Sequence, residues 1–265
     1  MRLIVGIILV YNMLNAIEFD LGKGRVHMQG GIWGIDQRLS SDVNIYTLKE
    51  DQQPIYKQWY YRYAISHFTS QTMPFSLLEN YIPIDVTHQM QGWDINLAIG
   101  KTVFQKHGSS IAVEGITGAS FPWIESRWSQ EIALKLFDFA QMTQTDISTY
   151  KMGVGAKFRH DFSRNISFLA HGIYAYQRGE IQNTLIPSSF SSEGSFKEFD
   201  MAFRWINDAS FTLLPQNVYS TLGYRSKSWE LDEVAMTLFE QQVSSSAMAF
   251  ESDIGEVYFG IGYRF

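Results

Sequence analysis

Apolar side chains recur at every second residue along most of this chain, and this period limits its fold more than any other feature. Between Tyr150 and Arg159, the residues Tyr, Met, Val, Ala and Phe alternate with Lys, Gly, Gly, Lys and Arg. Similar splits occur in segments 59–68, 92–104, 197–205 and 257–265. Side chains of a β-strand point alternately to opposite faces, whereas a helix has a period of 3.6 residues. The sequence therefore predicts an all-β fold in which each strand has an apolar face and a face of polar residues and glycine.

Aromatic residues distinguish this pattern from that of a soluble β-sandwich. Phe, Tyr and Trp make up 15% of the chain, yet its mean hydropathy is −0.13. A sandwich favours Val, Ile and Leu on its inner faces and rarely combines glycine with isolated Lys and Arg on its outer faces. Aromatic rings at strand ends suit a membrane interface, and the interior of a membrane-spanning barrel is polar. In such an interior, we expect glycine to leave room for long charged neighbours.

Composition excludes several classes of function. The chain has 21 Lys and Arg against 27 Asp and Glu, so a basic surface for nucleic acid is not expected. It has no cysteine, which excludes disulfides, thiolate metal sites and a cysteine nucleophile. The spacing of its His, Asp and Glu residues matches no metal-binding motif, and its GxG segments lie on strands, without the helix that a dinucleotide site needs. We therefore predict no nucleic-acid partner, no metal and no cofactor.

The N-terminus has the character of a secretory signal peptide. Met1 and Arg2 give a positive start, and the apolar run at 3–10 is too short to cross a bilayer as a helix. We place the signal peptide at 1–16, although Leu14 stands where a small residue is preferred before the cleavage site. A buried N-terminal strand is the alternative. Residues 17–265 would then form a single domain.

The C-terminal segment Val-Tyr-Phe-Gly-Ile-Gly-Tyr-Arg-Phe, residues 257–265, resembles the final strand of Gram-negative outer-membrane β-barrel proteins. The resemblance extends over residues 17–265 and identifies no subfamily. It implies a closed, antiparallel, up-and-down transmembrane barrel in the cell outer membrane, surrounded by lipid and lipopolysaccharide. It also implies that the barrel-assembly machinery reads Tyr263 and Phe265. An ordinary last strand of a secreted domain is the alternative.

In this class of proteins the strand number is even, the periplasmic turns are short and the extracellular loops are long. These rules favour ten strands here, with twelve or eight as alternatives. The least regular candidate strand, 77–86, contains Pro83, which is unfavourable in a closed ladder. Four long outer loops are expected at 38–55, 120–146, 179–194 and 231–253. The ten strands are expected at 25–36, 59–68, 77–86, 92–104, 109–119, 147–159, 165–178, 195–206, 217–230 and 255–265.

The polar faces would point charged side chains into the lumen. Ten of these residues are candidates for a functional site: Arg62, Asp94, Glu114, Lys157, Arg159, Glu198, Asp200, Arg204, Arg225 and Lys227. Lys151, Arg264 and Glu256 also fall on inward faces, which gives eight positive against five negative groups. A ten-stranded barrel has at most a thin channel. These charges either pair across the lumen and brace the wall, or line a mildly cationic conduit.

The leading functional hypothesis is a narrow porin-like channel, or a binding conduit for a small anionic solute. The alternative is a structural or adhesive protein with an occluded lumen that acts through its extracellular loops. An outer-membrane hydrolase is the least favoured class. His160 and Asp161 lie on a predicted periplasmic turn, and His171 near Ser167 has no recognisable third partner. No catalytic residue is therefore predicted.

Overall fold

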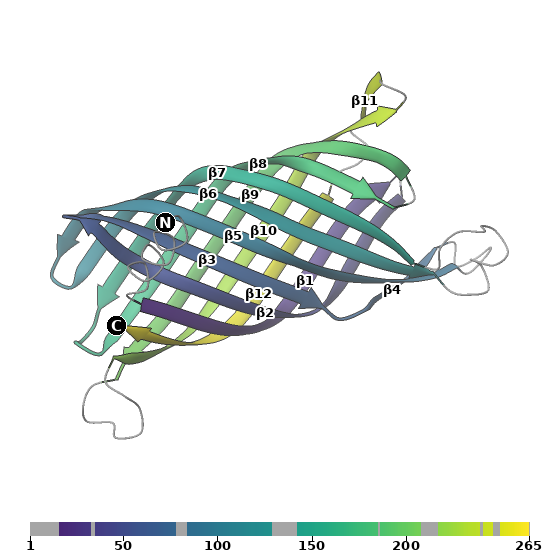
Figure 1. Ribbon diagram of the computed structural model, residues 1–265. Helices are drawn as coiled ribbons and strands as arrows, with labels where there is room; N and C mark the ends of the chain where they lie inside the picture. Colours follow the sequence, from purple (N-terminus) through teal and green to yellow (C-terminus); the bar gives the residue numbers. More distant parts are fainter. Residues whose placement is uncertain are drawn as a thin grey trace, which may run out of the picture.

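The chain forms a closed barrel of ten antiparallel strands in the computed structural model (Figure 1). The structure describes residues 16–32, 35–77, 84–128, 142–184, 186–207, 217–238, 241–245 and 250–264. The ring closes because β1 pairs with both β2 and β12, and β10 with both β9 and β12. Its strands are β1 (Ala16–Ile32), β2 (Ile35–Tyr56), β3 (Trp59–Ser70), β5 (Ile84–Lys106), β6 (Ser109–Trp128), β7 (Met142–Asp161), β8 (Ile166–Asn183), β9 (Ile186–Ile206), β10 (Val218–Leu238) and β12 (Phe250–Arg264).

Two short strands lie outside this ring. β4 (Met73–Leu77) pairs with β5, and β11 (Gln241–Ser245) pairs with β10. In the described part of the chain, no helix has the length and apolar character needed to span a membrane.

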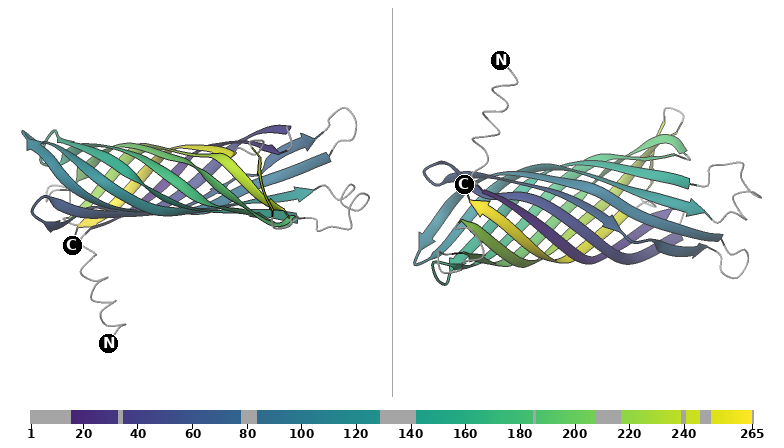
Figure 2. Two further views of the ribbon diagram at one scale, coloured as in Figure 1. Left: turned by 90° about the horizontal axis from the view of Figure 1, so that it is seen from above. Right: turned by 60° about the horizontal axis from the view of Figure 1, so that its bottom comes forward.

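The two ends of the barrel differ. Ala16 at the start of β1 pairs with Arg264 at the end of β12, so both described chain ends lie at one end of the cylinder (Figure 2). The same end carries the two-residue turns at 57–58 and 107–108. His107 and Gly108 have φ angles of 48° and 77°, which is the left-handed backbone that a tight hairpin requires. We call this the inner end, because short turns and termini face the periplasm in outer-membrane barrels. The opposite end is the outer end.

The predicted fold class and strand count are confirmed, and predicted strand 92–104 lies within β5, but the assignment before it was wrong. Predicted strand 25–36 covers the end of β1 and the start of β2. Segment 38–55, predicted as a loop, belongs to β2. Segment 77–86, predicted as a strand, is not one: β4 ends at Leu77, residues 78–83 lie outside the described part, and β5 begins at Ile84. As a consequence β3 runs outward, not inward. The two errors cancel in the count of ten.

Most of the predicted outer loops are strand. β6 continues to Trp128, β8 to Asn183 and β10 to Leu238, well beyond the predicted ends of these strands. Part of each of the other three predicted loops, such as residues 129–141, lies outside the described residues. Residues 1–15 and Phe265 lie there too, so the signal peptide and the assembly signal remain predictions. The barrel wall therefore extends far past the height that a bilayer requires, since a spanning strand needs about 9–11 residues.

The extension was missed because the apolar face of each strand changes sides along its length. On β1, Phe19 and Leu21 point outward and are about half exposed, with 46% and 51% of their surface accessible. Further along the same strand, Val26 and Met28 point inward and are buried. The apolar set thus moves from odd to even positions, which breaks the period of two that predicts a strand.

The same reversal occurs on the other strands. On β10, Leu222 and Tyr224 face outward, whereas Trp229 and Leu231 are buried inside. The level of the reversal defines two halves of the barrel. The inner half reaches from the inner end to the last inward-facing polar residues before the apolar interior, which are Asp20 on β1, Thr47 on β2, Asp94 on β5, Lys151 on β7, Lys227 on β10 and Glu256 on β12, and the outer half lies beyond these residues.

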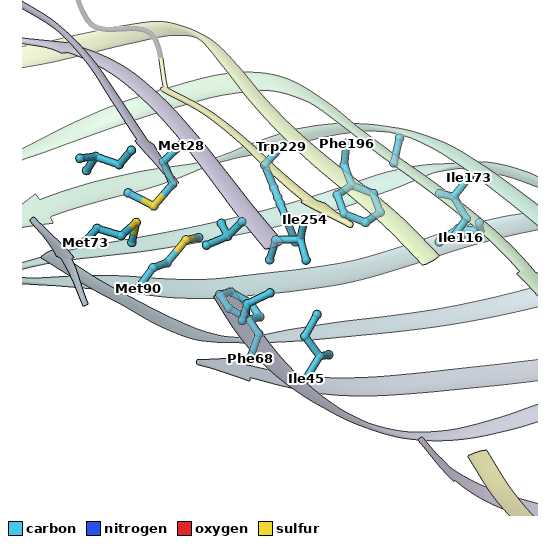
Figure 3. Packing of buried hydrophobic residues seen from close by; sticks show 14 of the residues in the cluster. Met28, Ile45, Phe68, Met73, Met90, Ile116, Ile173, Phe196, Trp229 and Ile254 are labelled. Atoms are coloured by element: carbon cyan, nitrogen blue, oxygen red, sulfur yellow. The ribbon is translucent and has the colours of Figure 1, made fainter. Parts of the chain in front are cut away.

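The lumen of the outer half is filled by an apolar cluster, which also reaches into the inner half at Ala98 on β5, contrary to the expectation of a polar interior. Figure 3 shows Met28, Phe68, Met90, Trp229 and Ile254 pointing toward one another from five strands. The rings of Phe68 and Trp229 lie 6.0 Å apart between their centroids. We call the residues of this cluster the apolar plug: Val26, Met28, Leu39, Val43, Ile45, Phe68, Met73, Met90, Ala98, Ile116, Ile173, Ala175, Phe196, Trp229 and Ile254.

Some glycines of the polar faces leave room for charged side chains, as we expected: a Cβ on Gly22 would meet the Glu256 carboxylate, and a Cβ on Gly260 would meet that of Asp20. Other glycines lie beneath aromatic rings. Gly100 is paired with Tyr60 across β5 and β3, and a Cβ on Gly100 would lie 2.4 Å from Tyr60 Cζ. A Cβ on Gly223 would lie 2.5 Å from Cζ of its partner Tyr258. Each ring folds over the bare backbone of its neighbour, which is a known way to support glycine in a strand. Glycine is therefore required at these positions by close packing.

Replacing Gly100 by Ala is expected to lower the free energy of unfolding by roughly 1–3 kcal/mol, because the added methyl group overpacks the Tyr60 ring. Urea unfolding of the protein in phospholipid vesicles measures this change. The matched control is Gly115→Ala, whose Cβ would have no atom within 4 Å and should change stability by less than about 0.5 kcal/mol. If Gly100→Ala costs as much in a Tyr60→Ala background, the ring is not the reason for glycine here.

Candidate functional site

The structure places all ten candidate residues with their side chains toward the lumen. Eight of them are buried, while Asp200 and Arg159 retain 17% and 26% of their side-chain surface. They come from β3, β5, β6, β7, β9 and β10. Their placement follows from the regular alternation within the inner half, where successive polar residues point inward. Whether they form a functional site depends on what they contact.

Asp94 is the centre of the first group of contacts. Its carboxylate accepts hydrogen bonds from Ser120 Oγ at 2.6 Å and from Asn96 Nδ2 at 3.2 Å. It also forms ion pairs with Lys227, at 2.8 Å, and with Lys151. Strands β5 and β10, which carry Asp94 and Lys227, lie opposite each other in the ring. This ion pair therefore crosses the full width of the lumen.

Further bonds cross the lumen at the same level. Lys227 Nζ donates to Ser66 Oγ at 3.2 Å, and Asn96 Nδ2 donates to Glu198 at 3.3 Å. Lys227 and Glu198 are 3.8 Å apart. The strands joined in this way, β3 with β10 and β5 with β9, are four positions apart in the ring. Several independent bonds thus close the barrel at its middle.

Arg225 is the centre of the second group. Its guanidinium forms ion pairs with Asp20 at 2.9 Å, with Asp200 at 3.1 Å and with Glu256 at 3.1 Å. It also donates to Thr47 Oγ1 at 3.1 Å. The five N–H donors of a guanidinium permit this number of partners, which a lysine could not match.

This second group continues toward the inner end. Lys49 Nζ lies 2.8 Å from Asp20 and 3.2 Å from Glu18. Arg204 Nη2 donates to Glu18 at 2.7 Å, and Tyr258 Oη donates to Asp200 at 2.7 Å. Alternating positive and negative groups thereby cover the wall from β9 to β2.

A third group surrounds Glu114. Its carboxylate accepts from Tyr60 Oη at 2.8 Å and from Arg62 Nη2 at 3.1 Å. His171 Nε2 lies 2.9 Å from the same carboxylate. His171 is therefore held against an acid, a contact that sequence spacing did not reveal because the two residues are 57 positions apart.

At the inner mouth the adjacent residues His160 and Asp161 have different partners. Asp161 pairs with Arg159 at 2.7 Å and accepts from Ser167 Oγ at 2.6 Å. His160 Nδ1 lies 2.8 Å from Ser109 Oγ on the neighbouring strand. The pair weighed as a hydrolase candidate is thus divided between two unrelated contacts. Among the described residues, no group of three or more His, Asp or Glu side chains is arranged to hold a metal ion.

Sequence reasoning missed four charged residues of the lumen network. Glu18 and Asp20 precede the predicted first strand, and Lys49 and Glu50 lie in the segment predicted as a loop. Glu18, Asp20 and Glu50 are each at most 1% exposed. Together with Asp161, these acids offset the predicted surplus of positive charge in the described lumen. Residues 17–24 continue the alternation of the first predicted strand toward the N-terminus. Extending that strand back from Arg25 would therefore have found Glu18 and Asp20.

A small cavity remains inside the inner half, with a volume of about 50 Å³. A buried water needs about 10–15 Å³ of such volume, so the cavity has room for a few waters or one small ligand. Between this cavity and the outer end stand the Asp94 contacts and the apolar plug. The ionisable lining residues are Lys49, Glu50, Arg62, Lys157, His171, Glu198, Asp200, Arg204, Arg225 and Lys227.

Replacing Arg225 by Met is expected to lower the free energy of unfolding by about 3–5 kcal/mol, because it leaves buried carboxylates without their shared partner. Arg25→Met is the matched control. Arg25 is 66% exposed and lies 3.9 Å from Asp42, so its loss should cost less than about 1 kcal/mol. Urea unfolding in vesicles compares the two. Equal small losses would contradict a network that depends on Arg225.

Comparisons with known proteins agree with this architecture. No protein-family model matches the sequence, and no curated protein sequence matches it. Among solved structures, the outer membrane protease OmpT of Escherichia coli gives a TM-score of 0.57 at 9% identity, over 95% of this chain and 97% of that chain. The transport unit of the autotransporter AIDA-I of Escherichia coli gives 0.43 at 8% identity, over 94% and 90%. The toluene transporter TodX of Pseudomonas putida gives 0.34 at 6%, over 95% and 90%. The likeness to OmpT, at a TM-score of 0.57 and 9% identity, concerns the fold alone, which is that of an outer-membrane β-barrel.

Proposed function

We propose that this protein is an occluded outer-membrane barrel that acts at the cell surface, in a structural or adhesive role, through its outer half. One observation carries the proposal. The ion pair between Asp94 and Lys227 joins opposite strands at 2.8 Å, so it stands directly across any path through the barrel.

The apolar plug supports occlusion on a second ground. An ion that passes through a barrel must keep water or polar groups around it, because transfer into apolar surroundings is costly. Phe196 and Trp229 are 5.6 Å apart between ring centroids and are almost fully buried. Met28, Met90 and Ile254 fill the same region. A solute would have to displace these side chains as well as the ion pairs.

The outer half presents a water-facing wall of paired strands. Exposed ion pairs connect neighbouring strands on it: Arg178 with Glu193 at 3.3 Å, and Lys197 with Glu230 at 2.5 Å. On β1, Lys23, Arg25 and His27 are exposed where a lipid-facing strand would carry apolar residues. Surface recognition by this protein would therefore involve strand residues as well as loops.

A groove in the outer half is the place where we expect recognition. It has a volume of about 210 Å³ and is formed by β1, β2 and β12. Its lining combines apolar side chains with charges of both signs, which suits a polar ligand with both donors and acceptors. The lining residues are His27, Met28, Gln29, Arg38, Leu39, Ser40, Glu251 and Asp253.

A narrow conduit is the second candidate. The observation that favours it is the excess of positive side chains around the inner cavity. It requires that both the Asp94 contacts and the apolar plug open, whereas the surface role requires no rearrangement. We therefore prefer the surface role.

The purified protein is expected to show no unitary conductance steps in planar bilayers with potassium chloride on both sides, because side chains close its lumen. Heat-modifiable migration in a gel confirms beforehand that the inserted protein is folded. Steady, reproducible steps from folded protein would contradict the occluded barrel.

In cells that display the protein, His27→Ala in the groove should reduce adhesion to matrix and glycan surfaces, whereas the exposed Arg178→Ala on β8 should not. If cells that display the wild-type protein adhere no better than cells without it, the adhesive role is contradicted and only the structural role remains.

A further inference from the structure

We propose that the cavity in the inner half of the lumen binds a small inorganic anion of the size of chloride. The cavity is bordered by six cationic side chains, from Lys49, Arg62, Lys157, Arg204, Arg225 and Lys227, and by three carboxylates, from Glu50, Glu198 and Asp200. This surplus is local, because the lumen network as a whole contains enough acids to offset its bases.

The surplus arises from the direction of the ion pairs. Arg62, Arg225 and Lys227 border the cavity, whereas Glu114 and Asp94 do not. Arg62 contacts Glu114 at 3.1 Å, and Lys227 contacts Asp94 at 2.8 Å. In both pairs the carboxylate stands behind the cation as seen from the cavity.

The same orientation recurs in the group around Arg225. Asp20 and Glu256 lie 2.9 and 3.1 Å from its guanidinium and are not part of the lining. Glu18 stands in the same way behind Arg204, at 2.7 Å. Ion pairs that turn their positive ends to one point create a positive potential there, although each pair is neutral. Burial strengthens this potential, since little water is present to screen it.

Size and donors limit the ligand to a small anion. A volume of about 50 Å³ has room for a few waters, and it accommodates a halide together with a water. Lys and Arg side chains provide only donors, three per ammonium and five per guanidinium. The six cationic side chains outnumber the three carboxylates of the lining, so donors are in excess over the acceptors that a water or a neutral solute would also use.

The route to the cavity lies on the inner side. The Asp94 contacts and the apolar plug close it toward the outer end. Toward the inner end stand Arg159 and Asp161, which retain 26% and 38% of their side-chain surface. The anion would thus bind and leave through one mouth, so that the proposal describes binding without passage. It goes beyond the surface role, which needs no bound ion.

Crystals of the detergent-folded protein grown in sodium bromide test the proposal, because bromide substitutes for chloride and gives an anomalous signal. We expect an anomalous peak inside the cavity of the wild-type protein. Lys157→Met should abolish this peak or weaken bromide binding by roughly tenfold or more, a loss of about 1.4 kcal/mol. Lys106→Met is the matched control, because Lys106 is exposed at an inner-end turn; it should leave the peak unchanged.

Water alone in the cavity at saturating bromide overturns the proposal, and so does a peak that persists undiminished in folded Lys157→Met. If Lys157→Met does not fold, a second measurement on the wild-type protein takes its place: the broadening of the chlorine-35 NMR line of chloride in solution with the protein. Saturable broadening that bromide displaces supports the site, and its absence contradicts it. The outcome is separate from that of the proposed function. Bromide in the cavity of a conducting barrel would contradict occlusion alone, whereas an empty cavity in a silent barrel would contradict the anion site alone.

Discussion

A single closed ladder of backbone hydrogen bonds passes from lipid into water, and the rest of this structure depends on that constraint. In lipid, backbone groups have no water to bind, so only a ring without free edges is stable. Here the ring continues past the membrane into water with unbroken pairing, for example from Ala16 to Gly30 between β1 and β12. The backbone stays the same while the solvent outside changes. The side chains must therefore exchange faces, as Leu21 and Val26 do on β1.

This exchange places two different interiors in contact inside one tube. In the inner half the apolar side chains face outward to lipid, so the alternating polar and charged side chains face the lumen. The outer half encloses an apolar core, as a soluble barrel does. The two interiors meet at Ser120, whose Oγ donates to Asp94 and accepts from Trp229 Nε1 at 3.2 Å. Nearby, Lys151 lies over the ring of Phe196, at 3.6 Å from its centroid. Charged and apolar layers support each other at this level and close the lumen together.

The occlusion is consistent with the energetics of buried charge. Isolated ions would be unstable inside the barrel, but a network in which each cation has carboxylate partners can remain there. Arg225 has three such partners, and Asp94 has two cationic ones. The aromatic residues above glycine, such as Tyr60 above Gly100, take up the remaining space. These contacts support our proposal that the interior is a filled core and not a channel wall.

Much of the inner half could be predicted from the sequence, because its alternation is regular. The inward placement of Arg62, Lys157 and Arg204 follows from parity alone. The outer half could not be predicted in the same way, since the apolar set changes parity where the solvent changes. On β2 the irregular register between Glu50 and Gln53 adds to this difficulty. Nor could the partners be predicted, because Asp94 and Lys227 are 133 residues apart and meet only when the ring closes.

The reversal of faces along β1 is the central claim, and the absence of cysteine from the chain makes it directly measurable. Single cysteines would replace Leu21, Val26 and His27 in turn, and each folded variant, reconstituted in vesicles, would be treated with a thiol-specific spin label. The account predicts that the label at position 21 collides with oxygen dissolved in lipid, and that the label at position 27 collides with a water-soluble nickel complex. At position 26 the free thiol should resist labelling until the protein unfolds. Rapid labelling at 26, or lipid contact at 27, would contradict the account.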